Sequence, residues 1–390
     1  MKICALVAEY NPFHLGHLKH IDYIKNELGA ENIVVIMSGN FTQRGEPAVL
    51  NKYTRAKHAV IAGADAVIEL PAVFATANAE TFATGAINIL DDLSAIDGLC
   101  FGVESGDKEQ FFSLASAMLD ESKEFKRILK GHLESGVSLA KAKFLTVKEL
   151  NGEEFSEELI SLPNNILGLE YAKAILKRNS GIQAFPMLRE GDHNSLVLKK
   201  GITSATSIRQ KIKELKLKKL KKSLPPYVYG DLTPYPYAFD KITTAALITA
   251  TKEQLAEIPD CTEGLENRIK ALIKDNKNID ALVEKIATKR YTASRIRRIF
   301  TANLLGITQE FTDECKNAHL YAKVLAVNKD NKEIISMLAK NSRIPVITRK
   351  SDIAQLKKTA EKCYDLDVKA SDLYNLATNE NTNENQMLIV

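Results

Sequence analysis

The chain has 390 residues, of which 45% are hydrophobic and 26% are charged, and its formal net charge is +4. This composition is typical of globular proteins and excludes a disordered or fibrous chain, while the small net charge alone does not indicate a nucleic-acid partner. Five widely spaced cysteines form no CxxC pair, which argues against a zinc motif or a disulfide framework, so we expect reduced thiols and a cytoplasmic protein.

Short apolar runs alternate with helix-compatible stretches along the first half of the chain. The apolar runs predict strands at residues 3–7, 32–37, 65–70, 98–102 and 184–188. The stretches between the first four predict helices at residues 15–28, 52–62 and 77–90. This alternation is typical of a Rossmann-like α/β fold with a doubly wound parallel sheet. We expect no secretion signal, because the N-terminus lacks a basic n-region, a long apolar h-region and a small-residue cleavage site. We expect no membrane span, because no window reaches roughly 18 consecutive apolar residues.

Helix-compatible stretches dominate after residue 163. Residues 204–220 predict one long basic helix, and the string Pro225-Pro226-Tyr227 marks a break in the pattern. A short strand is expected near residues 344–347. The expected division is a catalytic domain at 1–224, a mainly helical domain at 225–377 and a frayed tail at 378–390.

The loop after the first expected strand leads into His14-Leu15-Gly16-His17. In an open parallel sheet, ligands bind beyond the carboxyl ends of the strands, where a helix N-terminus offers N–H groups to an anion. Two imidazoles three residues apart share one helix face, and Gly16 permits close approach. The pattern predicts ATP binding, with His14 and His17 as catalytic donors to phosphate charge. An isolated histidine more often only caps its helix, so the placement in the first strand-loop-helix unit carries the prediction.

Hydroxyl and basic side chains mark three further candidate regions. Ser204, Thr206 and Arg209 begin a helix and suit phosphate, although an ordinary helix cap with an exposed arginine has the same pattern. The loop after the second strand could shape a substrate pocket with Ser38, Gly39, Gln43 and Arg44, or be merely structural. Lys52 and Arg55 could reach a phosphate or be plain surface charge.

Two basic clusters could bind RNA, although most charge runs are only solvated faces. The first has seven lysines between residues 211 and 222, and the second contains Lys289, Arg290, Tyr291 and Arg297. Helical spacing would place Arg290 and Arg297 on one face, where Tyr291 could stack on a base.

Several strings make the sequence resemble a known family. HxGH with the later Thr206 and Arg209 resembles the HIGH-type nucleotidyltransferase superfamily. Over nearly the full length, the chain closely resembles the bacterial tRNA(Met) cytidine acetate ligases. The strings that carry this second resemblance are Glu9-Tyr10-Asn11-Pro12-Phe13-His14, Met37-Ser38-Gly39-Asn40-Phe41, Gln43-Arg44-Gly45-Glu46-Pro47-Ala48, Pro163-Asn164-Asn165-Ile166-Leu167-Gly168 and Lys289-Arg290-Tyr291-Thr292.

The resemblance implies that ATP activates acetate to acetyl-adenylate, and that the acetyl group passes to the wobble cytidine of elongator tRNA(Met) to give N4-acetylcytidine. It implies ATP as co-substrate. We expect Mg²⁺ because the phosphates of ATP usually carry it, and we expect no obligate protein partner. No metal ligand is assigned. The family's ATP-binding loop falls on Val7, Ala8, Glu9, Tyr10, Asn11, Pro12, Phe13, His14, Leu15, Gly16, His17, Leu18, Lys19 and His20.

Further nucleotide contacts implied by the resemblance fall on Gly102, on Asn164 or Asn165, and on Arg189. Gly102 ends a strand, where a missing side chain would admit the adenosine, and Arg189 follows a strand and could clamp phosphate. One alternative is a small-molecule adenylyltransferase or acyl ligase that never acts on RNA. Another is a nucleotide-dependent RNA-binding module without chemistry. The basic region after Pro226 argues against the first, and the histidine pair argues against the second.

Overall fold

The computed structural model describes residues 1–137, 139–151, 155–189, 204–234, 238–276, 278–288 and 290–390. Within them the chain forms one eight-stranded sheet in the order β5-β4-β1-β2-β3-β6-β7, and β8 pairs with β6. The strands are β1 (Ile3–Ala8), β2 (Asn32–Ser38), β3 (Ala66–Leu70), β4 (Gly98–Val103), β5 (Gln183–Leu188), β6 (Ala322–Val327), β7 (Val346–Ile347) and β8 (Leu388–Ile389).

The first five strands are parallel, as predicted. β1 lies at the centre and pairs with both β2 and β4, so the strand order reverses beside it, which is where ligands bind in such sheets. The Rossmann-like α/β prediction is therefore confirmed, and its strand positions agree with the structure to within one residue. The sheet is mixed rather than wholly parallel, because β6 runs antiparallel to β3.

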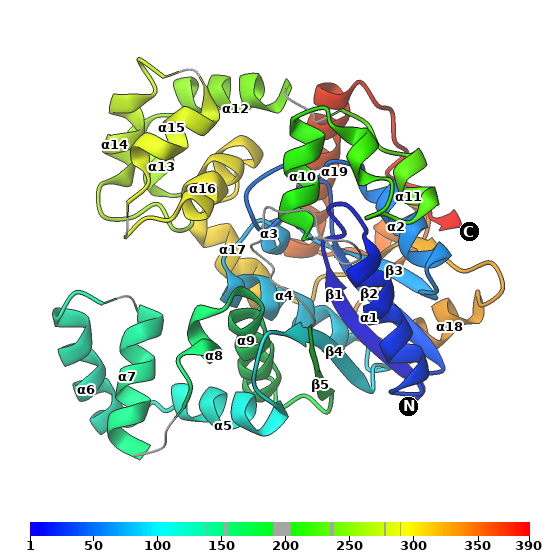
Figure 1. The fold of residues 1–390 in the computed structure, drawn as a ribbon, viewed down its shortest axis with the longest axis horizontal. Coiled ribbons are helices and arrows are strands. Elements are labelled where there is room, and N and C mark those ends of the chain that lie inside the picture. Colours follow the sequence, from blue (N-terminus) through cyan, green and yellow to red (C-terminus); the bar gives the residue numbers. More distant parts are fainter. Residues whose placement is uncertain (138, 152–154, 190–203, 235–237, 277, 289) are drawn as a thin grey trace.

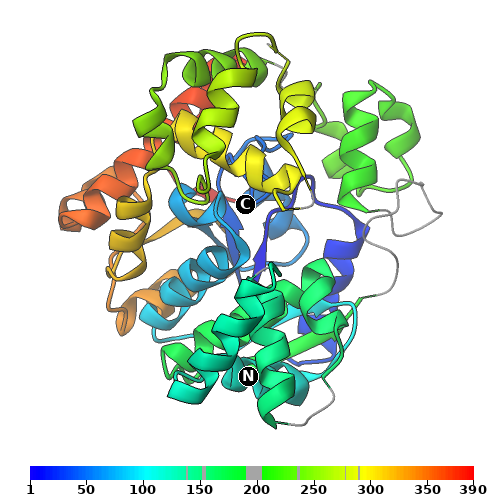
Figure 2. The same ribbon diagram turned by 90° about the vertical axis from the view of Figure 1, so that its left-hand side faces the viewer.

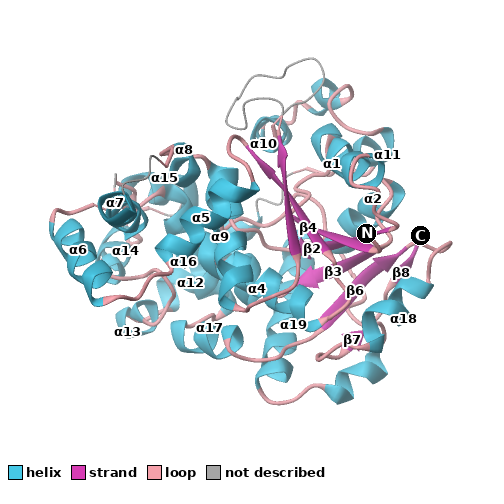
Figure 3. Ribbon diagram, turned by 90° about the horizontal axis from the view of Figure 1, so that it is seen from below, coloured by secondary structure: helices cyan, strands magenta, loops and turns pink. Residues whose placement is uncertain are grey.

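Helices cover both faces of the sheet (Figure 3). Alternate residues of one strand enter separate cores: Val34 packs on one face and Val35 on the other. The Val35 face is covered by α1 (Leu15–Asn26), α2 (Lys52–Ile61), α10 (Ala205–Lys213) and α11 (Pro226–Gly230). The Val34 face is covered by α3 (Ala72–Ala75), α4 (Ala79–Asp92), α5 (Lys108–Met118), α9 (Pro163–Lys177), α17 (Gln309–Lys316), α18 (Glu333–Lys340) and α19 (Thr359–Thr378).

Two groups of helices extend from this sheet on the same side of the molecule (Figures 1 and 2). One group is α6 (Lys123–Glu134), α7 (Leu139–Asn151) and α8 (Glu158–Ser161). The other, which we call the helical lobe, is α12 (Ala238–Thr249), α13 (Lys252–Ala256), α14 (Leu265–Leu272), α15 (Ile279–Ile286) and α16 (Ala293–Leu305). None of the helices that the structure describes has the length and apolar character needed to cross a membrane.

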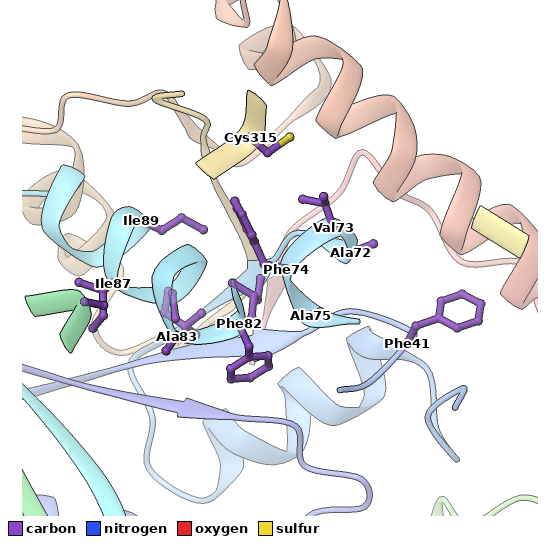
Figure 4. Close-up of a cluster of buried hydrophobic side chains, with 14 of the residues drawn as sticks. Phe41, Ala72, Val73, Phe74, Ala75, Phe82, Ala83, Ile87, Ile89 and Cys315 are labelled. Atoms are coloured by element: carbon purple, nitrogen blue, oxygen red, sulfur yellow. The ribbon is translucent and has the colours of Figure 1, made fainter. Parts of the chain in front are cut away.

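The chain differs from the expected division into domains at two points. After the helical lobe it returns to the sheet, where β6 extends the edge next to β3, and Cys315 of α17 lies beside Phe74 of α3 in one hydrophobic cluster (Figure 4). Residues 378–390 are not a frayed tail, because β8 pairs with β6 and the Glu384 side chain is buried. Long-range pairing of this kind leaves no local pattern in the sequence.

The single helix expected at 204–220 is also wrong. α10 ends at Lys213, and a separate 3₁₀ helix, η1, covers Leu217–Leu220. Between them Leu215 has a positive φ of 56°, which no α-helix accommodates. A second 3₁₀ helix, η2, spans Lys350–Gln355.

Four buried charges connect the C-terminal segment to the sheet. Lys52 of α2 contacts Glu69 of β3 at 2.8 Å and Glu384 at 2.7 Å, and Lys323 of β6 contacts the same carboxylates at 3.2 and 2.5 Å. Burial alone would raise the pKa of the Glu384 carboxyl, but the two lysines outweigh it and lower that pKa to about 2. Stability from this carboxylate is therefore present above its unfolded pKa and is lost as the pH falls toward 2.

Lys52→Met should destabilise the fold strongly, because it leaves two buried carboxylates with one lysine. The expected loss in the free energy of unfolding is about 3–5 kcal/mol, measured by urea denaturation. Lys126→Met is the matched control, since that lysine pairs with Glu121 on the surface. Equal urea midpoints for the two variants would contradict a structural role for the buried charges.

Candidate active site

Both histidines of the HxGH segment form the N-terminus of α1. His14 is the N-cap, with extended backbone, and its Nδ1 accepts the Gly16 N–H at 3.1 Å. The His17 Nδ1 accepts the His14 N–H at 3.2 Å, which completes a reciprocal capping box. The two rings stack with centroids 3.7 Å apart and planes within 17°. The two side chains predicted to be catalytic are thus also the ones that cap the helix.

This capping fixes the protons of the two imidazoles. Because each Nδ1 accepts a backbone N–H, the neutral form of each ring carries its proton on Nε2. The rings therefore carry their protons on Nε2 and lie at the N-terminus of α1, after the loop that follows β1 and beside the N–H groups of that helix end. Such a set of donors suits a polyphosphate.

Hydrogen bonds from three directions fix the loop between β1 and α1. The Asn11 side-chain oxygen accepts the Val49 N–H at 2.8 Å, and Nη1 of Arg209 donates to the Asn11 carbonyl at 2.9 Å. The Glu9 Oε1 accepts the Gln43 N–H at 2.7 Å. The structure thus joins the ATP-loop candidates to α10 and to the loop after β2.

The remaining loop candidates have mainly structural surroundings. Phe13 is buried and packs 4.7 Å from the Tyr10 ring. Ser204 caps α10 by accepting the Ser207 N–H at 3.1 Å, and Thr206 accepts from Nη2 of Arg209 at 3.3 Å. The other candidates continue the same segment: Val7 and Ala8 end β1, Pro12 lies in the loop, and Leu15, Leu18 and Lys19 lie in α1.

Arg55 and Lys52 are neither surface charges nor placed to reach a phosphate, because both side chains are fully buried. Arg55 donates to the carbonyls of Glu9 at 2.6 Å and Ser38 at 3.0 Å, and also to that of Gly39. Burial lowers the pKa of Arg55 to about 10, which leaves it charged at neutral pH. Its role is to hold together the loops after β1 and β2.

The nucleotide-contact candidates after β4 and β5 lie against one another. Arg189 donates to the Asn164 side-chain oxygen at 3.2 Å. A Cβ on Gly102 would lie 2.5 Å from the Arg189 Cδ, so Arg189 occupies the space that the sequence interpretation gave to adenosine. Glu104, which that interpretation missed, accepts the Asn164 side-chain N–H at 2.6 Å and the Asn165 backbone N–H at 3.0 Å. Its position directly after β4 was the available signal.

The two asparagines at the start of α9 have different roles. The buried Asn165 side chain accepts the Glu104 N–H at 2.9 Å and donates to Ser105 at 2.9 Å and to the Glu158 carbonyl at 3.1 Å. Asn164 is only partly buried and contacts Arg189. Asn165 therefore fixes the loop after β4, and Asn164 is the better candidate for a ligand contact.

His20 lies between α1 and β4. Its Nε2 is 3.2 Å from the Cys100 sulfur. Burial, with a smaller contribution from the charge of Arg189, lowers the pKa of His20 to about 4. His20 is therefore neutral at physiological pH and links the histidine helix to the Arg189 side of the site.

The loop after β2 holds unpaired polar groups. The hydroxyl of Ser38 and the side-chain amide nitrogen of Gln43 are buried without a hydrogen-bond partner among the described residues. Such groups cost about 1–3 kcal/mol each unless water or a ligand pairs with them, which makes them candidates for a ligand contact. Gly39 is required because a Cβ would lie 2.4 Å from a Glu69 oxygen. The Arg44 side chain is exposed.

The second basic cluster lies close to this loop but is largely neutralised. Arg290 precedes α16, so its expected position on one helical face with Arg297 is wrong. Tyr291 donates to Glu263 at 2.9 Å, Arg290 pairs with the same carboxylate, and Arg297 pairs with Asp280 at 2.6 Å. Lys289 lies outside the described residues.

The loop after β2 also touches the helical lobe directly. A Cβ on Gly45, whose φ is 70°, would lie 2.3 Å from the Arg297 backbone, and Thr301 donates to the Gly45 carbonyl at 2.9 Å. Glu46 lies 3.4 Å from Nε of Arg297. The lobe therefore contacts a loop at the carboxyl ends of the strands, which is the end of the sheet where the histidines also lie.

The first basic cluster keeps more of its charge. Lys211 and Lys216 pair with Glu214, whose pKa falls to about 2 because of hydrogen bonds from Lys216, Gln210 and Lys211. The remaining exposed lysines have no ion-pair partner among the described residues, and we call them the η1 lysines: Lys218, Lys219, Lys221 and Lys222.

Comparisons with known proteins place this geometry in context. The profile of the HIGH Nucleotidyl Transferase family matches residues 1–388. The tRNA(Met) cytidine acetate ligase of Thermoanaerobacter sp. (strain X514) is 37% identical, over 97% of this chain and 96% of the relative. That of Acetivibrio thermocellus is 36% identical, over 96% of this chain and 94% of the relative.

Solved structures give the same result. The apo form of Thermotoga maritima TmcAL has a TM-score of 0.94 at 28% identity, with full coverage of both chains. The form bound with alpha-thio ATP has a TM-score of 0.92 at 29% identity, again with full coverage of both chains. An adenine nucleotide therefore binds a protein of this fold.

Asn164→Ala and Asn165→Ala should separate ligand contact from loop support. Asn164→Ala is expected to weaken binding of an ATP analogue while the unfolding midpoint changes little. Asn165→Ala removes several buried hydrogen bonds and should lower stability by about 1–3 kcal/mol. Calorimetric titration and urea denaturation measure the two effects, and the reverse pattern would show that the assignment is wrong.

Proposed function

The chain belongs to the HIGH nucleotidyltransferases, and within them to the tRNA(Met) cytidine acetate ligases, and from this premise we propose its reaction. It is an ATP-dependent ligase that activates acetate to acetyl-adenylate with release of pyrophosphate. It then transfers the acetyl group to the wobble cytidine of elongator tRNA(Met), forming N4-acetylcytidine. The observation that carries the proposal is the stacked pair of capping histidines at the N-terminus of α1.

Adenylation needs hydrogen-bond donors to the phosphate oxygens more than it needs a general base. As an acetate oxygen attacks the α-phosphorus, negative charge builds on the phosphate oxygens, and the bond to pyrophosphate breaks. His14 and His17 stabilise that charge through Nε2–H, in a geometry set before substrate binds. Arg189 and Asn164 contact the nucleotide from the side of β4 and β5.

The acetyl group occupies the loop after β2. The unpaired Ser38 hydroxyl and Gln43 amide are donors suited to the oxygens of a small carboxylate. The exposed Arg44 adds positive charge at the same loop. Mg²⁺ travels with the ATP phosphates and waters, since no three candidate metal-ligating side chains gather among the described residues.

The RNA follows the positively charged surface. The η1 lysines leave their charge available for phosphates, whereas Arg290, Tyr291 and Arg297 are already paired with carboxylates. The anticodon loop then reaches the acetyl-adenylate beside the helical lobe. Because tRNA is the acceptor, the site of action is the cytoplasm.

The decisive assay supplies ATP, labelled acetate and elongator tRNA(Met), followed by nucleoside analysis. Labelled N4-acetylcytidine is expected with all three components. His14→Asn keeps an N-cap oxygen for the Gly16 N–H but lacks Nε2–H, so the acetyl-adenylate rate should fall by on the order of 10²- to 10³-fold with the fold intact.

Formation of acetyl-adenylate without labelled cytidine would favour a small-molecule ligase of the same fold and end the RNA proposal. A His14→Asn variant that adenylates at the wild-type rate would remove the histidine role. Circular dichroism checks that the variant remains folded.

Replacing the four η1 lysines with serine should weaken tRNA binding through charge alone. The slope of log K against log salt is expected to decrease by about one for each lysine that contacts a phosphate. The matched control replaces Lys123, Lys126 and Lys130, which are exposed on α6. An unchanged salt slope in the η1 variant would place the RNA elsewhere.

A further inference from the structure

The transfer step needs a proton acceptor that adenylation does not. The N4 amine of cytidine attacks the acyl carbon, a C–N bond forms, and the C–O bond to AMP breaks with its electron pair on the phosphate. The nitrogen must then lose one of its two protons. A residue that accepts this proton has to lie next to the acyl group and must not already be paired.

The histidines do not meet this requirement. In the neutral tautomer that capping selects, Nδ1 of both His14 and His17 accepts a backbone N–H, and Nε2 already carries the proton. His20 is turned toward the Cys100 sulfur in the space between α1 and β4. The acceptor is therefore sought among the carboxylates.

Four carboxylates lie at the carboxyl ends of β1 to β4, and three are already paired. Glu46 lies beside Arg297 of the helical lobe, and Glu69 is ion-paired with two buried lysines. Glu104 accepts N–H groups at the start of α9. Glu9 is different: its Oε1 accepts one backbone N–H, and its Oε2 has no partner among the described residues.

Glu9 also lies in the right place. It follows directly after the central strand β1, and the bond from the Gln43 N–H fixes its carboxylate beside the loop that holds the unpaired Ser38 hydroxyl and Gln43 amide. Its backbone carbonyl is held by Arg55 at 2.6 Å. The carboxylate thus lies directly after the central strand and beside the loop proposed to hold the acetyl group.

We propose that Glu9 is the general base of acetyl transfer, taking the proton from cytidine N4 as that nitrogen attacks acetyl-adenylate. The N–H bond breaks as the carboxyl O–H forms, AMP leaves, and the carboxyl returns its proton to water after product release. Oε1 anchors the carboxylate on the Gln43 N–H, and Oε2 accepts the proton. Because a carboxylate accepts hydrogen bonds and donates none, it also favours the amine of cytidine over the carbonyl of uridine.

Glu9→Gln separates this role from loop support, because the glutamine oxygen still accepts the Gln43 N–H. Since this role rests on the proposed function, both half-reactions are measured. Acetate-dependent exchange between ATP and pyrophosphate should fall far less than the transfer step. Single-turnover transfer from acetyl-adenylate to tRNA should fall by on the order of 10²- to 10⁴-fold. Glu27→Gln, at the far end of α1, is the matched control.

A second variant tests proton transfer directly. In Glu9→Ala, added azide should restore part of the transfer rate and leave the exchange rate unchanged, which a loop-anchoring role alone does not predict. Wild-type transfer by Glu9→Gln, equal losses in both half-reactions, or no rescue by azide would each overturn the assignment. A wild-type enzyme that forms acetyl-adenylate but never acetylates tRNA would overturn the proposed function instead, whatever Glu9 does.

Discussion

One buried guanidinium, that of Arg55, determines the shape of the site. It reaches from α2 to four backbone carbonyls, in the loops after β1 and β2 and at Leu50. Five N–H donors in a rigid plane can satisfy several carbonyls that would otherwise be buried and unpaired, and no other side chain offers that geometry. The histidine loop and the acyl loop are therefore held as one unit, so the placement of one sets the placement of the other.

The buried charges around Lys52 support this unit from below. Glu69 lies under Gly39 so closely that no side chain fits there, and the same carboxylate is held by lysines from α2 and β6. The rigid edge then carries two kinds of chemistry with little overlap. In the proposed reaction, imidazole N–H groups stabilise phosphate charge on one side, and a carboxylate and unpaired donors act on the acetyl group on the other.

Local patterns in the sequence were sufficient for the strands and for the histidine helix. Apolar runs of five or six residues predict buried parallel strands, and the N-cap position of His14 follows from its place after β1. Local patterns were insufficient wherever a charged side chain has a partner that is far away in the sequence. Arg55 and Lys52 resemble surface residues until the carbonyls and carboxylates around them are known, and the choice between Asn164 and Asn165 depends on Glu104, some 60 residues earlier. The basic cluster at Arg290 looked available because its carboxylate partners are Glu263, in the loop before α14, and Asp280 of α15.

The position of Glu384 also bears on how the protein is made. Lys52 and its last carboxylate are 332 residues apart in the chain, and β6, which covers the outer edge of β3, begins about 250 residues after that strand. During translation the first five strands can form while β3 is still an open edge and two of the four buried charges are still missing. The ribosome must therefore translate residue 384 before all four buried charges next to the histidine site are present and the edge of β3 is covered. Incomplete chains lack both, so they are natural targets for chaperones and proteases.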